Sequence, residues 1–413
     1  MKVYTSATVV STAANYIMNS KDTFTHTYRT YIQTRENGPL KLRFWHSNAV
    51  DSTWDQGEVA RGSESGGAWV IEAAYVADGG KISDSVKAQD GGKISDSGKA
   101  QDGEKVPDSG KGPASEKTPD GSVVAGSQIP VTFGGSPAKV VEPGERFWSD
   151  SVEIDLPEGH YLAFTWTITT TNTGKTFPYN TEQMLVTAYD APGNLADSAA
   201  PAAFALSDNL LVLPAFIGYE KPVDQQVVFF GDSITQGVRT LRDGYEYWVA
   251  RIANGLGAQA GIWNIGSGWA RAYDAAEDGA WLHKAKQGQQ VMIALGVNDI
   301  DIGKRTAEQL LGDLATIVRL LKQNEPSTEI ILFTVPPFNF SGEQEQIWRQ
   351  VNETIRTVPP EGVSRVFDMA AVLSQPAPLE HRLRPEYMSS KDDPHPNGTA
   401  GKAVSDAFLA WYR

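Results

Sequence analysis

The sequence contains no cysteine in its 413 residues. Disulfide bonds, thiolate nucleophiles and metal sites with cysteine ligands are therefore excluded. Since cysteine-free proteins occur in every redox compartment, the absence does not indicate where the protein resides.

The sequence also lacks an excess of positive charge. It contains 36 lysines and arginines and 50 aspartates and glutamates, which gives a net charge of −14. Binding to the phosphates of nucleic acids or to anionic membranes requires a basic surface. We therefore expect neither a nucleic acid nor a membrane among the partners of this protein.

Long apolar runs are absent as well. No segment approaches the roughly 18 apolar residues of a membrane span. The N-terminal segment MKVYTSATVVSTAANYIMNS has one basic residue, Lys2, and lacks the continuous apolar core of a signal peptide. We expect a cytoplasmic protein, and secretion stays open for a chain whose leader was removed or whose export is unconventional.

The length favours two domains, each long enough to bury its own core. In the first half, short runs rich in β-branched and aromatic residues are separated by Gly, Pro, Asn and Asp, without an amphipathic helix between them. These runs are LKLRFWHS (40–47), AWVIEAAYVA (68–77), IPVTF (129–133) and HYLAFTWTITTT (160–171). Such spacing predicts an all-β sandwich domain, jelly-roll-like, over residues 1–222.

A degenerate repeat with a period of about 12 residues interrupts this domain. It starts at Asp78 and reads DGGKISDSVKAQ, DGGKISDSGKAQ and DGEKVPDSGKGP. Its composition offers too little apolar surface to offset the entropy of ordering, so we predict a disordered insertion over 78–123. The Asp and Gly spacing also fits a calcium loop, but the missing apolar docking residues favour a solvated loop.

From about residue 225 strand-like and helix-like segments alternate. The predicted strands are VVFF (227–230), IWNIG (262–266), VMIAL (291–295), EIILFTV (329–335) and VSRVFDM (363–369), and the predicted helices cover 306–323, 343–357 and 398–412. This alternation predicts an α/β domain over 223–413, with a parallel sheet covered by helices on both faces. The active sites of such sheets lie at the carboxyl ends of the strands.

The first of these strands leads into GDSITQG (231–237), which contains Ser233. A serine just past a buried strand, at the start of a helix, stands at the mouth of the sheet, where its own N–H can face an oxyanion. On its own, the segment fits a plain strand–turn–helix junction with a capping serine equally well.

The next two strands end in NIGSGW (264–269) and GVND (296–299). A glycine lets a substrate oxygen approach a backbone N–H closely, and an asparagine amide supplies a donor without a competing charge. Three neighbouring strand ends thus each offer one candidate oxyanion donor, although each turn alone fits a structural role.

The segment DDPHPNG (392–398) precedes the last predicted helix. Neutral histidine is suited to take the proton of a serine near pH 7, and a carboxylate must hold its imidazole in the correct tautomer. We predict His395 as general base and Asp392, across one tight turn, as its orienting carboxylate. Asp393 is the weaker candidate and fits a helix cap. The other five histidines are interpreted as surface or packing residues.

Together these four segments resemble the motif blocks of the SGNH (GDSL-type) hydrolase superfamily, over about residues 225–413. The resemblance implies a flavodoxin-like, three-layer αβα domain with five parallel strands. It assigns Ser233 as the nucleophile and matches the DxxH block to Asp392 and His395.

The same resemblance implies an oxyanion hole formed by Ser233, Gly268 and Asn298, with Gly266 as the alternative to Gly268. Asp232, Trp269 and Val297, each next to one of these three residues, are the candidate substrate contacts. Trp269, and Trp45 from the front domain, are candidates to stack on a sugar ring, although tryptophan is also a common core residue.

The front half is similar to the β-sandwich that precedes the catalytic domain in one branch of bacterial SGNH hydrolases. The residues that carry this similarity are LKLRFWHSNAV (40–50) and IPVTFGGSPAKVVEPGERFWSDSVEIDLPEGHYLAFT (129–165). That branch is linked to carbohydrate de-esterification, notably the removal of acetyl groups from xylan. The repeat insertion and the missing signal peptide depart from it, and the latter weakens a role on an extracellular polymer.

We therefore expect a serine esterase for short acyl esters, first of all acetyl groups on a saccharide such as acetylated xylan, with no metal or organic cofactor. A lysophospholipase or thioesterase for longer acyl chains is the alternative. A glycan-binding protein, with the sandwich as its binding module, is the alternative of a different class. The sequence leaves open whether the sandwich binds glycan, forms a wall of the active-site cleft or makes an oligomer contact.

Overall fold

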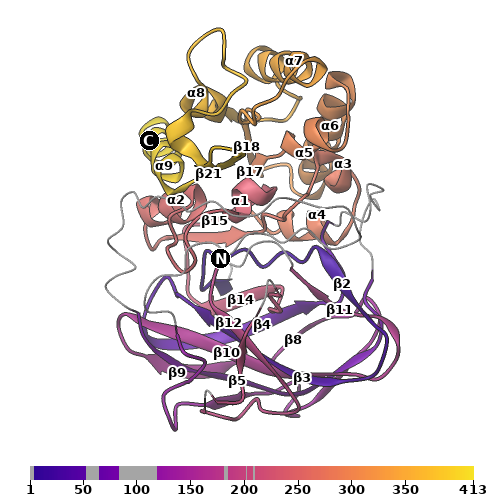
Figure 1. The fold of residues 1–413 in the computed structure, drawn as a ribbon, viewed down its shortest axis with the longest axis vertical. Coiled ribbons are helices and arrows are strands. Elements are labelled where there is room, and N and C mark those ends of the chain that lie inside the picture. The colour runs from indigo at the N-terminus through magenta and orange to yellow at the C-terminus, as the bar shows by residue number, and fades with distance from the viewer. Residues whose placement is uncertain (1–3, 53–64, 83–118, 181–184, 201, 208–209) are drawn as a thin grey trace.

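The structure is a computed structural model that describes residues 4–52, 65–82, 119–180, 185–200, 202–207 and 210–413. Two domains are stacked along the longest axis of the molecule, the strand-rich domain below and the helix-containing domain above in Figure 1. The last strand of the lower domain, β14 (Phe216–Glu220), is followed after four residues by the first strand of the upper domain, β15 (Gln225–Gly231).

The N-terminal domain consists of antiparallel strands in two main sheets. One sheet has the order β1 (Tyr4–Ser6), β14, β4 (Gly38–Ser47) and β8 (Arg146–Trp148), with β9 (Val152–Leu156) also paired to β4. The other has the order β13 (Ala205–Leu206), β12 (Ala188–Pro192), β3 (Thr25–Ile32), β10 (His160–Thr170), β5 (Trp69–Lys81) and β6 (Ile129–Val131), with β7 (Lys139–Val141) beside β5. A separate pair is formed by β2 (Tyr16–Ser20) and β11 (Gly174–Tyr179).

The core of this domain lies between the two sheets, because alternate residues of their strands point to the same side. Leu40, Leu42 and Phe44 of β4 are buried in the same cluster as Phe164 and Trp166 of β10. The rings of Phe44 and Phe164 meet at a centroid distance of 4.8 Å across the gap. The four strands predicted from the sequence are present as β4, β5, β6 and β10.

Both flanks of the predicted insertion, residues 78–82 and 119–123, are ordered in the structure, which differs from the prediction. Strand β5 continues to Lys81, and Asp78 accepts a hydrogen bond from Nδ1 of His160 at 2.8 Å. At the far end, Val123 is buried in a cluster with Tyr31 and Tyr161. These flanks are ordered because they pair with a neighbouring strand and bury side chains, and the repeat residues 83–118 lie outside the described part of the chain.

The C-terminal domain contains a five-stranded parallel sheet in the order β16 (Ala260–Asn264), β15, β17 (Gln290–Ala294), β18 (Glu329–Phe333) and β19 (Arg365–Phe367). Its helices are α1 (Ser233–Gln236), α2 (Trp248–Leu256), α3 (Ala272–Ala275), α4 (Ala280–Ala285), α5 (Val297–Asp301), α6 (Ala307–Asn324), α7 (Glu343–Thr357), α8 (Met369–Leu373) and α9 (Gly398–Tyr412). A 3-10 helix, Pro385–Tyr387, precedes a small hairpin of β20 (Met388–Ser390) and β21 (Asp393–Pro396).

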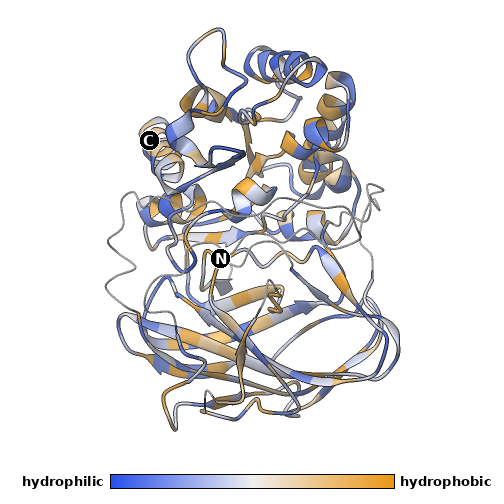
Figure 2. Cartoon of the chain, viewed as in Figure 1, coloured by the Kyte–Doolittle hydropathy of each residue, from blue (hydrophilic) through white to orange (hydrophobic). Residues whose placement is uncertain are grey.

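Helices cover both faces of the parallel sheet (Figure 1). The consecutive residues Phe229 and Phe230 of β15 point to opposite faces, since Phe229 packs against Trp248 of α2 and Phe230 against Trp281 of α4. Hydrophobic residues gather on the strands and the inward faces of the helices, while the outer faces of α6 and α7 are mostly hydrophilic (Figure 2). The three-layer αβα fold and its N-terminal all-β domain are therefore as predicted.

The five strands and three helices predicted from periodicity are present, with small differences at their ends. Strands β16 and β18 stop at Asn264 and Phe333, so residues 265–266 and 334–335 belong to loops at the carboxyl edge of the sheet. In the described part of the chain, every helix is too short or too polar to cross a membrane.

Candidate active site

The segment GDSITQG joins β15, the strand between β16 and β17, to helix α1. Gly231 is required there because a Cβ atom would lie 2.0 Å from Oγ1 of Thr235 and 2.6 Å from the carbonyl oxygen of Ala294. The backbone can therefore turn tightly at the strand end. Ser233 follows as the first residue of α1, and it is 7% exposed.

The hydroxyl of Ser233 meets the imidazole of His395 at this edge. Ser233 Oγ and His395 Nε2 are 3.1 Å apart, although 162 residues separate them in the sequence. His395 lies on β21, in the hairpin immediately before helix α9. The two side chains that the sequence analysis selected for nucleophile and base are thus within hydrogen-bonding distance.

In the structure Asp393, and not the predicted Asp392, contacts the imidazole of His395. Asp393 Oδ1 lies 2.6 Å from His395 Nδ1, whereas the side chain of Asp392 is 80% exposed beside Lys391. The sequence analysis assumed a tight turn that would bring Asp392 and His395 together. Residues 393–396 instead form an extended strand, in which positions i and i+2 share a face.

A sequence signal for this conformation exists. Asp393 precedes Pro394, and His395 precedes Pro396. A residue before proline is driven out of the helical region into the extended region by a clash with the proline ring. The DPHP pattern therefore favours an extended segment, and with it Asp393 as the partner of the imidazole.

Arg239 extends the line of contacts and was not identified from the sequence. Its Nε donates a hydrogen bond of 2.7 Å to Asp393 Oδ2, the oxygen that does not contact the imidazole. Burial alone would raise the pKa of Asp393, but the hydrogen bonds from His395 and the charges of His395 and Arg239 outweigh burial and hold that pKa below its usual value. The carboxylate is therefore kept ionised beside the ring.

Phe338 is a second residue that the sequence analysis missed. It follows β18 and contacts His395 edge-on, with ring centroids 5.1 Å apart and an interplanar angle of 87°. The phenyl ring therefore restricts the rotation of the imidazole on the side that it contacts. Its position one loop beyond a buried parallel strand is the signal that could have indicated it.

The loop after β16, residues 265–271, distinguishes between the two candidate glycines for the oxyanion hole. The N–H of Gly266 already donates to Asn264 Oδ1 at 2.9 Å, and a Cβ atom on Gly266 would lie 2.4 Å from the amide nitrogen of Gln236. The N–H of Gly268 has no hydrogen-bond partner within the described part of the protein. Gly266 therefore packs against α1, and Gly268 is the glycine whose donor is open to a ligand.

Asn298 lies at the carboxyl end of β17, in the second position of helix α5. Its Nδ2 donates one hydrogen to the carbonyl oxygen of Ala270 at 3.0 Å, which fixes the amide and leaves its second hydrogen for another acceptor. Gly296 allows this turn, because its φ is +132° and a Cβ atom would lie 2.6 Å from Cγ2 of Val335.

Two of the three candidate substrate contacts have buried side chains. The side chain of Asp232 is 2% exposed and caps helix α1 by accepting the N–H of Ile234, and the side chain of Val297 is 2% exposed within the hydrophobic core. Neither side chain is placed to contact a substrate in this structure, because the backbone directs both inward. Trp269 is 37% exposed next to Gly268 and has φ of +64°, a strained conformation for a tryptophan.

Trp45 does not lie at this site. It packs edge-on against Trp263 of β16 at 6.4 Å and beside His283 of α4 at 6.0 Å. These contacts place Trp45 at the boundary between the domains, so the structure favours a packing role over the stacking of a sugar.

Two buried carboxyl groups organise the backbone around the site. Asp299 accepts the N–H groups of Ala272 and Tyr273, at 2.8 and 3.2 Å, and so holds the end of the 265–271 loop. Burial raises the pKa of Asp232 to about 7 and that of Asp299 to about 7. In the described part of the chain, no group of three or more His, Asp or Glu residues is arranged to hold a metal ion.

Residues 229–403 match the sequence profile of the GDSL-like Lipase/Acylhydrolase family, while a comparison with curated proteins gives no match. Among solved structures, the chain is similar to a family 3 carbohydrate esterase from Talaromyces cellulolyticus, with 16% identity, a TM-score of 0.36 and coverage of 45% of this chain and 95% of that chain.

Two further solved structures are similar to this chain. One is a family two carbohydrate esterase from Clostridium thermocellum in complex with cellohexaose, with 12% identity, a TM-score of 0.36 and coverage of 99% of this chain and 97% of that chain. The other is the carbohydrate acetylesterase Est24 from Sinorhizobium meliloti, with 14% identity, a TM-score of 0.34 and coverage of 46% and 98%. The matched profile and the motif segments at one sheet edge identify residues 229–403 as a GDSL-like domain of the SGNH hydrolase superfamily.

Proposed function

We propose that this protein is a serine esterase in which Ser233 is the nucleophile, His395 the general base and Asp393 the orienting carboxylate. One observation carries the proposal: a continuous line of contacts runs from Ser233 Oγ to His395 Nε2 at 3.1 Å and from His395 Nδ1 to Asp393 Oδ1 at 2.6 Å. A serine hydroxyl is a weak nucleophile until an adjacent base takes its proton.

The chemistry follows from the roles of the two ring nitrogens. Asp393 accepts the Nδ1–H of His395, which leaves Nε2 unprotonated and able to take the proton of Ser233. As Oγ attacks the ester carbonyl, the imidazole gains this proton and then delivers it to the departing alcohol. Water, deprotonated by the same nitrogen, releases the acid and restores the serine.

The oxyanion of the tetrahedral intermediate requires donors at the same edge. We assign this role to the N–H groups of Ser233 and Gly268 and to the side-chain amide of Asn298, which follow three adjacent strands of the sheet. The open N–H of Gly268 and the fixed amide of Asn298 support the assignment. One such donor is typically worth about 3 kcal/mol of barrier.

For the substrate we propose a short acyl ester, with acetyl on a saccharide as the first choice. The exposed ring of Trp269 adjoins Gly268, where it can stack on the sugar that forms the alcohol part of the ester. A long-chain ester is the competing substrate class. A panel of acetyl, octanoyl and decanoyl esters together with acetylated xylan separates the two, because an acetyl esterase loses kcat/KM as the acyl chain lengthens.

The first prediction concerns Ser233 itself. Ser233→Ala should abolish the hydrolysis of p-nitrophenyl acetate, leaving less than about 0.1% of the wild-type rate, because no other hydroxyl contacts His395 Nε2 in the described structure. Ser405→Ala is the matched control, since Ser405 is also buried in the same domain and its hydroxyl bonds, within the described residues, to the carbonyl oxygen of Lys402. Thermal unfolding should be similar for both variants. Unchanged hydrolysis by Ser233→Ala would refute the proposed function.

A further inference from the structure

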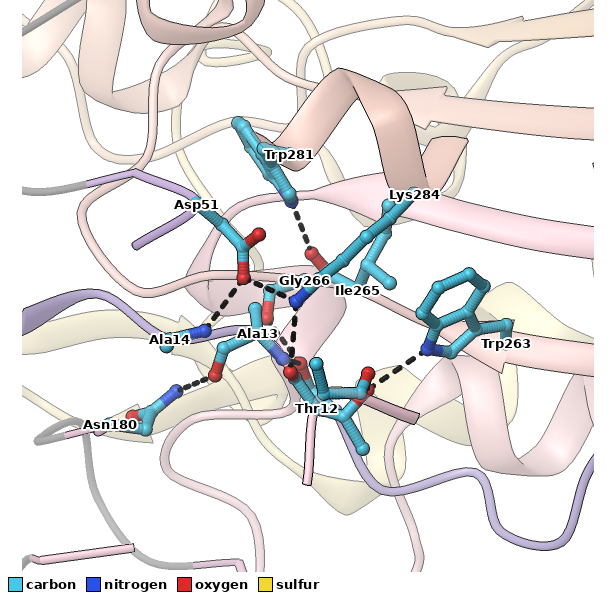
Figure 3. A network of polar contacts seen from close by, with 12 residues as sticks. Thr12, Ala13, Ala14, Asp51, Asn180, Trp263, Ile265, Gly266, Trp281 and Lys284 are labelled. Atoms are coloured by element: carbon cyan, nitrogen blue, oxygen red, sulfur yellow. Dashed lines mark hydrogen bonds and ion pairs between the residues drawn. The ribbon is translucent and has the colours of Figure 1, made fainter. Parts of the chain in front are cut away.

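A short stretch of the N-terminal domain lies next to the candidate active site. After β1, the chain runs along the boundary between the two domains, and residues 11–14, here called the boundary segment, lie against the end of β16 (Figure 3). The residues of this segment are buried or nearly so.

The boundary segment holds the backbone of the loop that carries Gly268. Ser11 Oγ donates to the carbonyl oxygen of Gly266 at 2.5 Å, and the N–H of Thr12 donates to the carbonyl oxygen of Asn264 at 3.3 Å. The indole N–H of Trp263, on the same strand, donates to Thr12 Oγ1 at 2.9 Å (Figure 3). Three contacts from the N-terminal domain therefore fix the end of β16 and the loop that follows it.

The α/β domain holds the same loop from the other side. The N–H groups of Ile265 and Ser267 donate to the carbonyl oxygens of Phe229 and Gly231 on β15, each at 2.9 Å, and the indole N–H of Trp281 donates to the carbonyl oxygen of Ile265 at 2.8 Å. The backbone is thus fixed on both sides up to Ser267. The next N–H group, that of Gly268, is the one left open.

The boundary segment is itself held rigidly. Lys284 Nζ on α4 lies 2.6 Å from Asp51 Oδ2, with the two side chains 1% and 0% exposed, and it also donates to the carbonyl oxygen of Thr12 at 3.2 Å (Figure 3). Asp51 Oδ2 accepts the N–H of Ala14 as well, and Asn180 Nδ2 donates to the carbonyl oxygen of Ala13 at 3.2 Å. The segment is therefore a fixed support and not a loose strand end.

Asn180 also connects the boundary segment to helix α1. Its Oδ1 accepts a hydrogen bond of 3.3 Å from Nε2 of Gln236, three residues after Ser233. The same region of the N-terminal domain therefore contacts both the loop with Gly268 and the helix that begins with Ser233.

From these contacts we infer that Ser11 is a positioning residue of the active site, which fixes the peptide plane of Gly266 and through it the direction of the Gly268 N–H. The N-terminal domain is then an integral part of the catalytic machinery and not a detachable binding module. The inference rests on the proposed esterase function and adds to it the role of this domain.

The physical reason is that one residue, Ser267, separates the carbonyl group of Gly266, which Ser11 holds, from the N–H of Gly268. Without the Ser11 hydroxyl, the buried carbonyl oxygen of Gly266 loses its donor, and the peptide group between Gly266 and Ser267 keeps the bond from the N–H of Ser267 to Gly231, about which it can tilt. Such a movement changes the direction of the N–H of Gly268. A donor displaced by a fraction of an ångström stabilises the oxyanion less, while the ground-state substrate is bound almost as well.

The test compares Ser11→Ala with Ser6→Ala on the full-length protein. Ser6 is 1% exposed and lies in β1, before the boundary segment, and within the described residues its hydroxyl bonds to the backbone of Thr8 alone. Ser11→Ala should lower kcat for p-nitrophenyl acetate about tenfold with KM changed less than twofold. Ser6→Ala should keep kcat within twofold. The pH profile should keep its midpoint in both, because the contacts of His395 are untouched.

A second measurement reports on the oxyanion hole directly. Phenylboronic acid forms a tetrahedral adduct with an active-site serine, so its inhibition constant should rise for Ser11→Ala by about the factor that kcat falls. Ser11→Thr, which keeps a hydroxyl, should recover most of both losses. All rates are measured well below the melting temperature of each variant, which thermal unfolding establishes.

The outcomes separate the inference from the function on which it rests. Wild-type protein without Ser233-dependent hydrolysis contradicts the proposed function. If the wild type is active, the inference is overturned when Ser11→Ala keeps its kcat, when it raises KM without lowering kcat, or when Ser6→Ala loses as much activity. An unchanged inhibition constant for the boronic acid overturns it too.

Discussion

At the scale of single residues, four side chains form one line of contacts from the candidate nucleophile outward. Ser233, His395, Asp393 and Arg239 are joined by distances of 3.1, 2.6 and 2.7 Å. Each member fixes the next: the arginine holds the second carboxylate oxygen, the carboxylate sets the tautomer of the ring, and the ring orients toward the hydroxyl. These contacts predict that catalysis depends on Asp393 and not on the adjacent Asp392.

Asp393→Asn should lower kcat by about 10³–10⁴-fold, because an amide in place of the carboxylate favours the wrong imidazole tautomer. Asp392→Asn is the matched control, and its exposed side chain predicts a kcat within twofold of the wild type. Steady-state kinetics on p-nitrophenyl acetate measures both. Greater sensitivity at Asp392 than at Asp393 would show that the extended hairpin is not the active conformation.

At the scale of elements, the strand–helix junctions at the carboxyl edge are built around buried carboxyl groups. Asp232 caps α1 and Asp299 holds the loop before α3, and burial raises the pKa of each to about 7. A raised pKa means that the folded protein keeps a proton that the unfolded chain has already lost above about pH 4. The contribution of this proton to the free energy of unfolding is fully present below pH 4 and is lost as the pH rises through 7.

The free energy of unfolding should therefore fall between pH 5 and pH 8, and Asp232→Asn should flatten this fall. The neutral amide keeps an oxygen for the N–H of Ile234 and carries no charge to bury. The gain at pH 8 is a few kcal/mol at most, since one pKa unit corresponds to about 1.4 kcal/mol. Urea unfolding at both pH values measures it. Equal pH dependence in variant and wild type would mean that Asp232 is ionised in the folded protein throughout this range.

At the scale of the whole molecule, the boundary between the two domains contains polar and charged groups beside its aromatic contacts. Besides the pair of Lys284 and Asp51, Arg35 of the N-terminal domain donates to the carbonyl oxygens of Ala260 and Gly257, at 2.5 and 2.8 Å. Buried charged groups of this kind are costly unless every partner is present. The domains are therefore expected to depend on each other for stability.

Lys284→Met should lower the free energy of unfolding by about 3–5 kcal/mol, because it leaves Asp51 buried without its cation. Lys402→Met is the matched control, since the pair of Lys402 and Asp406 is more than half exposed on α9 and contributes little. Urea unfolding measures both variants. If the two variants had the same stability, the buried pair would have no role in joining the domains.

Much of the site was predictable from the sequence because its signals are local. The apolar runs of β15, β16 and β17 predict adjacent parallel strands, and parallel strands bring their carboxyl ends to one edge. Ser233, Gly268 and Asn298 follow these strands directly, so their common location required no knowledge of distant contacts. His395 was identified because its motif immediately precedes the last helix.

Other features depended on the tertiary structure because their causes are not local. Asp393 replaces Asp392 since residues 393–396 form a strand paired with β20, and Val297 is buried because the backbone turns its side chain into the core. The sequence by itself determined the fold class and which residue types meet at the sheet edge. Only the packing of one domain on the other decided that Ser11, more than 200 residues before Ser233, supports the loop that carries Gly268.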